Sequence, residues 1–143
     1  MQPLKVVRIF DPAFLDGEAV AAGIGEYGKT RDFTKLATLL KPGALPVVFH
    51  VQGAKRSTWT QIRDTPGEGA QMQAAFRHCV KRVENHPDLG AVWTPAGASM
   101  TEDELDLFEI ADLEEIGSVA YQETHLPKAP GRRFRLSPLS LSA

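Results

Sequence analysis

The chain has 143 residues, of which 43% are hydrophobic and 24% are charged, and its formal net charge is −2. This composition is typical of one soluble domain with one core, and the length excludes two full domains. No apolar run reaches the roughly 20 residues of a membrane helix, and the first residues lack the apolar stretch of a signal peptide. We therefore expect an intracellular or virion-borne protein without a membrane partner.

The first elements are a strand and a glycine-rich segment. Residues 4–10 (LKVVRIF) are rich in β-branched residues and are stopped by Asp11-Pro12, which predicts a strand. Residues 13–31 contain repeated glycines, which predicts a partly ordered loop with at most a short helical turn around residues 18–22. Apolar residues then recur at helical spacing over residues 32–40, which predicts a short helix.

The middle of the chain alternates between strand and helix signals. Residues 45–52 (LPVVFHVQ) predict a second strand, and residues 57–64 fit either a short helix or a strand. After a break at residues 65–69, residues 70–84 have apolar side chains at positions i, i+3, i+4, i+7, i+8 and i+11. This spacing predicts a core-facing amphipathic helix with the buried residues Met72, Ala75, Phe76, Cys79, Val80 and Val83.

Two further helices are expected after a connection at residues 85–98. Thr101 and Glu104 have the spacing of a capping box, which predicts a short helix that runs to about Phe108. A longer helix is predicted over residues 112–124, where Leu113, Ile116, Gly117 and Ala120 form one stripe. The fold class is therefore α+β: one small domain over residues 1–127, with a short sheet packed on several helices.

Residues 128–143 predict an extended C-terminal arm. Residues 101–125 contain nine carboxylates and no Lys or Arg, whereas residues 126–143 contain four basic residues and no acid. This asymmetry indicates that the arm docks electrostatically, on its own body or on a neighbouring subunit. The arm also alternates leucines with Ser and Pro, which favours a protein partner over nucleic acid. We expect the partner contacts at Arg132, Arg133, Phe134, Arg135, Leu136 and Leu139.

One motif suggests an alternative function. Residues 23–30 (GIGEYGKT) match the phosphate-loop pattern G-x-x-x-x-G-K-[ST], so Gly28, Lys29 and Thr30 are candidate nucleotide-binding residues. The expected strand, however, ends about a dozen residues before the motif, and Glu26 would bring a carboxylate toward the phosphates. The sequence favours a glycine-rich connector and leaves nucleotide binding as the alternative.

No other constellation indicates catalysis, a cofactor or a metal. The four histidines have no metal-ligand spacing, and Cys79 lies within the apolar stripe of the helix predicted at 70–84, where a thiol acts as a small hydrophobe. We therefore expect a protein that is not an enzyme and binds neither a cofactor nor a metal.

The layout of residues 32–127 resembles that of small tailed-bacteriophage proteins encoded among head and tail morphogenesis genes. The similarity lies in the order of LPVVFHVQ, AFRHCVKRVEN, a loop with Trp93 and Pro95, and LDLFEIADLEEIGSVAYQETHLP. It implies a non-enzymatic structural or assembly protein that binds itself and other virion subunits of the capsid, connector or tail. A tail assembly chaperone that is absent from the mature particle is an alternative, as is a host adaptor protein.

Overall fold

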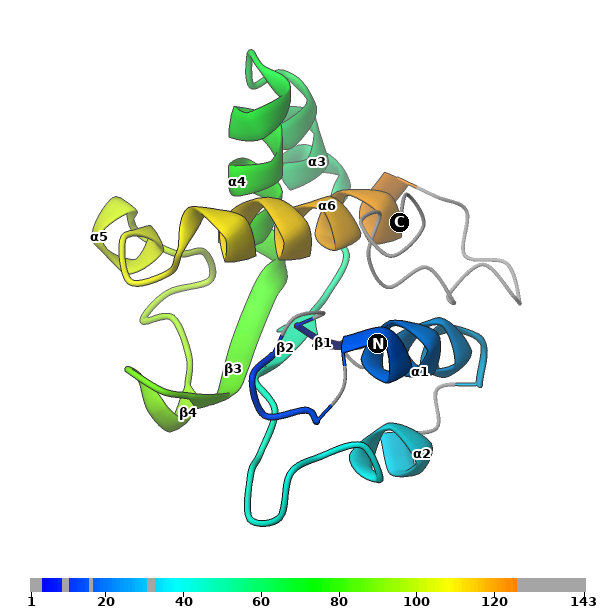
Figure 1. Ribbon diagram of the computed structural model, residues 1–143. Helices are drawn as coiled ribbons and strands as arrows, with labels where there is room; N and C mark the ends of the chain where they lie inside the picture. Colours follow the sequence, from blue (N-terminus) through cyan, green and yellow to red (C-terminus); the bar gives the residue numbers. More distant parts are fainter. Residues whose placement is uncertain (1–3, 9–10, 16, 31–32, 126–143) are drawn as a thin grey trace.

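The computed structural model describes residues 4–8, 11–15, 17–30 and 33–125. Its centre is an antiparallel four-stranded sheet in the order β1-β2-β3-β4. The strands are β1 (Leu4–Val7), β2 (Val48–Val51), β3 (Val80–His86) and β4 (Gly90–Trp93). The described residues also form six helices (Figure 1), so the predicted α+β class is confirmed.

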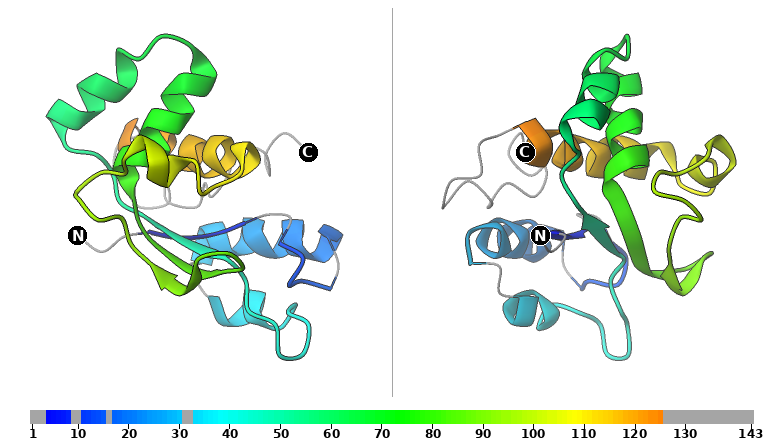
Figure 2. Two further views of the ribbon diagram at one scale, coloured as in Figure 1. Left: turned by 90° about the vertical axis from the view of Figure 1, so that its left-hand side faces the viewer. Right: turned by 180° about the vertical axis from the view of Figure 1, so that it is seen from behind.

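The helices form two groups on opposite faces of the sheet. α3 (Arg56–Arg63), α4 (Glu68–Cys79), α5 (Glu102–Leu105) and α6 (Ile110–His125) lie on one side. α1 (Gly17–Thr30) and α2 (Phe33–Ala37) lie side by side on the other side, near β1 and β2 (Figure 2). The sheet therefore separates two cores.

The side chains of β1 and β2 point alternately into the two cores. Val6 pairs with Phe49, and both belong to the main core beneath α3–α6. The next pair, Val7 and Val48, faces the opposite way and packs with Phe14, Tyr27 and Leu36 in a smaller core under α1 and α2. Successive side chains of a strand point to opposite faces of the sheet. Val6 and Phe49 therefore enter the main core, and their neighbours Val7 and Val48 enter the smaller core.

The predicted glycine-rich loop at residues 13–31 is wrong, because residues 17–30 form the helix α1. Glycine is unfavourable inside an isolated helix, but tertiary packing can override that preference. Tyr27 of α1 is 4% exposed in the smaller core. Gly23 lies so close to α2 that an added Cβ would stand 3.1 Å from Cδ1 of Leu36 in that helix, and 3.0 Å from Cδ1 of Leu39 just after it. Here glycine permits close contact between helices.

The predicted helix over residues 70–84 is correct only to Cys79, because residues 80–86 form β3. Val51 pairs with Val80 but His50 pairs with Arg82, so Lys81 is an extra residue in β3. This bulge turns Val80 and Val83 to the same side, and both are buried. Two buried residues that are three positions apart in this strand thus have the same spacing as neighbours on one face of a helix. The predicted connection at 85–98 also contains β4, which forms a hairpin with β3.

The remaining predictions agree with the structure more closely. The strand predicted at 45–52 is present as the shorter β2, which spans Val48–Val51, and residues 57–64 take the helical alternative as α3. The helix at 112–124 is confirmed as α6, and the capping box of Thr101 and Glu104 is present at α5. The helix at 32–40 is shorter than expected, because α2 ends at Ala37. The arm at 128–143 lies outside the described residues.

Candidate functional site

The most distinctive contact of the main core is the crossing of α4 and α6. Gly117 of α6 lies against the backbone of Met72 in α4, and a Cβ added to Gly117 would stand 2.0 Å from the Met72 carbonyl oxygen. The two helices therefore touch backbone to backbone at this point. Figure 1 shows that they run across one another rather than alongside, so they diverge on either side of the crossing.

A groove occupies the wedge between the diverging helices. Its volume is about 530 Å³, and it is lined by the first turns of α4 and the first half of α6, namely Glu68, Gly69, Met72, Ala111, Glu114, Glu115 and Ser118. Most of its surface is apolar, while Glu68 and Glu114 are exposed carboxylates on opposite helices. No Lys or Arg is among these lining residues. We call this feature the acid-rimmed groove.

Exposed apolar side chains continue from the acid-rimmed groove toward the start of α6. Ile110 is 59% exposed and Leu107 is 46% exposed. Ile110 precedes Glu114 by one helical turn, so the two lie on the same side of α6. Asp103 in the adjacent first turn of α5 adds further negative charge, whereas Glu102 beside it pairs with Arg77 over 2.6 Å. The result is an apolar strip in strongly acidic surroundings.

A buried ion pair ties the start of α6 to the sheet. Arg8, which follows β1, donates a hydrogen bond from Nη2 to Oδ2 of Asp112. Burial raises the pKa of the Asp112 carboxyl, although the charge and hydrogen bond of Arg8 act in the opposite direction. Breaking such a pair would leave an uncompensated buried charge. Arg8 and Asp112 therefore hold the helix that carries one wall of the groove.

A second, more polar pocket lies where β2, α3 and β3 meet. It has a volume of about 290 Å³ and is lined by Gln52, Gly53, Ala54, Lys55, Thr58, His78, Lys81, Ala98 and Ser99. His78 Nδ1 lies 2.8 Å from Ser99 Oγ, and burial lowers the pKa of His78, helped by the charges of Arg77 and Lys81. A serine–histidine pair needs a third group to orient the imidazole for nucleophilic catalysis. None of the nine lining residues is a carboxylate.

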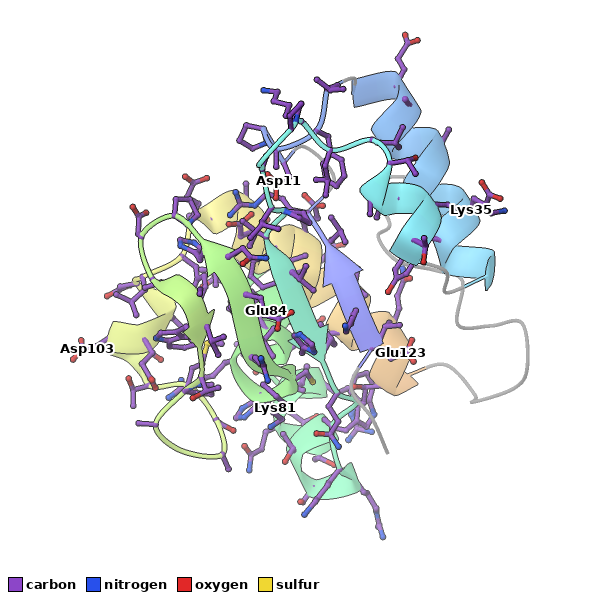
Figure 3. The ribbon with its side chains drawn as sticks, turned by 90° about the horizontal axis from the view of Figure 1, so that it is seen from below. Asp11, Lys35, Lys81, Glu84, Asp103 and Glu123 are labelled. Atoms are coloured by element: carbon purple, nitrogen blue, oxygen red, sulfur yellow. The ribbon has the colours of Figure 1, made fainter. Side chains whose placement is uncertain are left out.

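The part of the sheet that α1 and α2 leave open carries a chain of charged groups. His50 Nε2 lies 3.0 Å from Glu84 Oε1, and Arg82 Nη2 lies 3.0 Å from Glu84 Oε2. The hydrogen bond with His50 is the main cause that lowers the pKa of Glu84. Figure 3 shows Glu84 at the centre of this face. Satisfied pairs of this kind stabilise a solvated sheet face.

The structure does not place the candidate nucleotide-binding residues in a phosphate loop. Gly28, Lys29 and Thr30 form the last turn of α1, after which the chain enters α2. A phosphate loop precedes a helix, and its backbone N–H groups point at the anion. Interior N–H groups of a helix donate to carbonyls four residues earlier, and the end of a helix carries partial negative charge. Residues 28–30 therefore lack the loop geometry that phosphate binding by this motif requires.

The other expected site residues divide in two groups. Cys79 is fully buried, as expected, and burial raises the pKa of its thiol. The arm residues Arg132, Arg133, Phe134, Arg135, Leu136 and Leu139 lie outside the described part of the chain. The acid-rimmed groove was not anticipated, although the acidic bias of residues 101–125 indicated its charge. Its partner wall on α4 could not be inferred, because nothing in the sequence says that residues 68–72 meet residues 111–118.

Over the described ranges, no group of three or more His, Cys, Asp or Glu side chains is arranged to hold a metal ion. In the same part of the chain, no helix has both the length and the apolar character needed to cross a membrane.

We found no family model, no characterised protein and no solved structure that matches this chain.

Proposed function

We propose that the protein is a non-enzymatic structural or assembly protein of a tailed bacteriophage, which binds itself and neighbouring subunits of the particle. The observation that carries this proposal is the acid-rimmed groove with its exposed neighbours Leu107 and Ile110. An exposed apolar strip with a polar rim is the usual anatomy of a protein–protein contact. The phage context comes from the resemblance in sequence layout.

The charge distribution supports the same proposal. All eighteen acidic residues and twelve of the sixteen basic residues precede residue 126, so residues 1–125 carry a formal net charge of −6 and residues 126–143 carry +4. Opposite charges on two parts of one chain favour repeated association between copies, and complementary potentials also accelerate encounter. Virion components combine a compact body with termini that reach neighbouring subunits.

Light scattering across a concentration series tests the proposal on the full chain and on a chain truncated after Pro127. We expect the full chain to associate and the truncated chain to stay monomeric while it keeps its circular dichroism spectrum. Equal association of both would contradict a role for the arm. Mass spectrometry of purified particles distinguishes a virion component, which is present, from a tail assembly chaperone, which is found only in the infected-cell lysate.

A further inference from the structure

The geometry points to one specific contact, which rests on the proposed function: the arm of one copy, residues 128–143, binds in the acid-rimmed groove of a second copy. The groove lining includes the apolar side chains of Met72 and Ala111 and an exposed carboxylate on each wall, Glu68 and Glu114, while the third lining carboxylate, Glu115, is buried. Within the described residues, no ion pair involves either of the two exposed carboxylates. They are therefore available to cations of a partner.

The arm has the complementary chemistry. Its central run, Arg132-Arg133-Phe134-Arg135-Leu136, brings together three cations and two large apolar side chains. In an extended segment, alternate side chains share a face, so Phe134 and Leu136 can enter the groove together. Arginine side chains are long enough to reach carboxylates on both rims while their stems cover apolar surface. The volume of the groove falls in the range of roughly 300–1,000 Å³ that is typical of pockets for small molecules, so the groove has room for large apolar side chains.

The apolar strip beyond the groove matches the next leucine of the arm. Leu139 follows Phe134 by five residues, which is about 16 Å of extended chain. Ser118 and Ile110 lie eight residues apart on α6, which is about 12 Å of helix. An arm that runs from Ser118 toward the start of α6 would thus bring Leu139 to Ile110 and Leu107. The proposed contact accounts for the two most exposed apolar residues of this region.

The direction of α6 favours a second copy over the chain's own groove. α6 begins beside the groove, passes the α4 crossing at Gly117 and ends at His125 on the far side (Figure 1). His125 lies eleven residues beyond Glu114, or about 16 Å along the helix. An arm that leaves from this end must double back to reach its own groove, whereas a neighbour's groove can lie directly ahead. The resulting contact is head-to-tail, and such contacts generate rings or filaments.

A charge-reversal experiment on the full chain tests the contact. The groove variant is Glu68→Lys/Glu114→Lys, and the arm variant is Arg132→Glu/Arg133→Glu/Arg135→Glu. The control variant, Glu26→Lys/Asp88→Lys, reverses two exposed carboxylates outside the groove and the apolar strip. Sedimentation velocity measures association at low and high salt, since pairing between exposed charges weakens with ionic strength. We expect the groove and arm variants each to raise the dissociation constant by at least about tenfold, and the control to behave as wild type.

Mixing the two variants gives the decisive readout. The groove variant keeps an intact arm and the arm variant keeps an intact groove, and the reversed groove and the reversed arm also carry opposite charges. An equimolar mixture should therefore associate although neither variant does so alone. Misfolded variants could not restore association. If each variant is monomeric with the wild-type circular dichroism spectrum and the mixture stays monomeric, binding between copies through the groove is overturned.

The remaining outcomes separate this inference from the proposed function. Association of the groove and arm variants at wild-type strength would overturn the arm–groove contact but leave a self-associating assembly protein. A wild-type chain that stays monomeric but is recovered in purified particles would also overturn the contact and keep the function. A monomeric chain that is absent both from particles and from their assembly intermediates would overturn both.

Discussion

Tyr27 of α1 donates a hydrogen bond from its hydroxyl group to the backbone carbonyl of Lys5 in β1, over 3.0 Å. The ring of Tyr27 is 4% exposed in the smaller core, next to Val7 and Val48. The middle of GIGEYGKT is therefore anchored to the sheet. A residue that would crowd a phosphate loop instead attaches a helix to the edge strand.

Replacing Tyr27 should destabilise the protein in two distinguishable steps. Tyr27→Phe removes only the hydrogen bond to Lys5 and should lower the free energy of unfolding by about 1 kcal/mol. Tyr27→Ala also removes the buried ring and should cost about 3–5 kcal/mol. Urea denaturation measures both. Glu26→Ala is the control, because its ion pair with Lys35 is exposed and should contribute less than about 1 kcal/mol.

Nucleotide binding is expected to be absent. Calorimetric titration with ATP or GTP and magnesium should give no binding heat, because residues 28–30 form a helical turn rather than an anion cradle. Lys29→Ala should behave as wild type in the same titration. Micromolar binding that Lys29→Ala abolishes would instead show that this segment can rearrange into a phosphate loop.

The crossing of α4 and α6 should tolerate no side chain at Gly117. Gly117→Ala places a methyl group 2.0 Å from the Met72 carbonyl oxygen, and backbone on both sides must move to relieve the overlap. We expect a loss of about 3 kcal/mol or more in the free energy of unfolding, at the upper end of the range for overpacked cores. Thermal and urea denaturation measure the loss.

Gly25 provides the matched control for Gly117. It also lies inside a helix, α1, but a Cβ added there would meet no atom within 4 Å. Gly25→Ala should raise stability by up to about 1 kcal/mol, because alanine is the better helix former. Similar effects of the two substitutions would show that helix propensity, rather than the contact with Met72, governs Gly117.

Acid should weaken the protein through His86. Burial lowers the pKa of His86 below its ordinary value of 6.5, assisted by Arg8, while Asp88, Asp112 and Glu109 act in the opposite direction. The neutral Nδ1 accepts a hydrogen bond from the Asp88 backbone N–H, and the ring packs edge-on against Phe108. Below pH 6.5 the unfolded chain therefore binds more protons than the folded chain.

The free energy of unfolding should accordingly be highest above about pH 6.5 and should fall as the pH drops through the lowered pKa, by at most about 1.4 kcal/mol per pH unit for this group. His86→Asn keeps an acceptor near the Asp88 N–H but does not titrate in this range. Urea denaturation between pH 5 and 8 should give a flatter profile for the variant, with a lower value at pH 8 because the ring contact is lost. An unchanged slope would assign the acid sensitivity to other groups, of which His78 is the first to examine.

Local signals predicted the elements that depend on local chemistry. The capping box of Thr101 and Glu104 marked the start of α5, and the stripe of Leu113, Ile116 and Ala120 marked α6. These signals act within one helical turn, so their meaning does not depend on the rest of the chain. β2 was recognised for a similar reason, because its β-branched run is buried on both faces.

Elements that depend on distant partners were missed. The valines at 80 and 83 fit a helix until β2 is placed beside them, since only the bulge at Lys81 makes a spacing of three compatible with one face of a strand. Gly23 fits a loop until α2 is placed beside it.

The sequence alone established the α+β class, the buried thiol of Cys79 and the contrast between an acidic body and a basic arm, because composition and short-range periodicity carry these properties. Tertiary structure decided that GIGEYGKT is a helix anchored by Tyr27. It also decided that α4 and α6 meet at Gly117 and enclose an acid-rimmed groove. Both depend on contacts between residues far apart in the chain, and such contacts leave no local trace in the order of the amino acids.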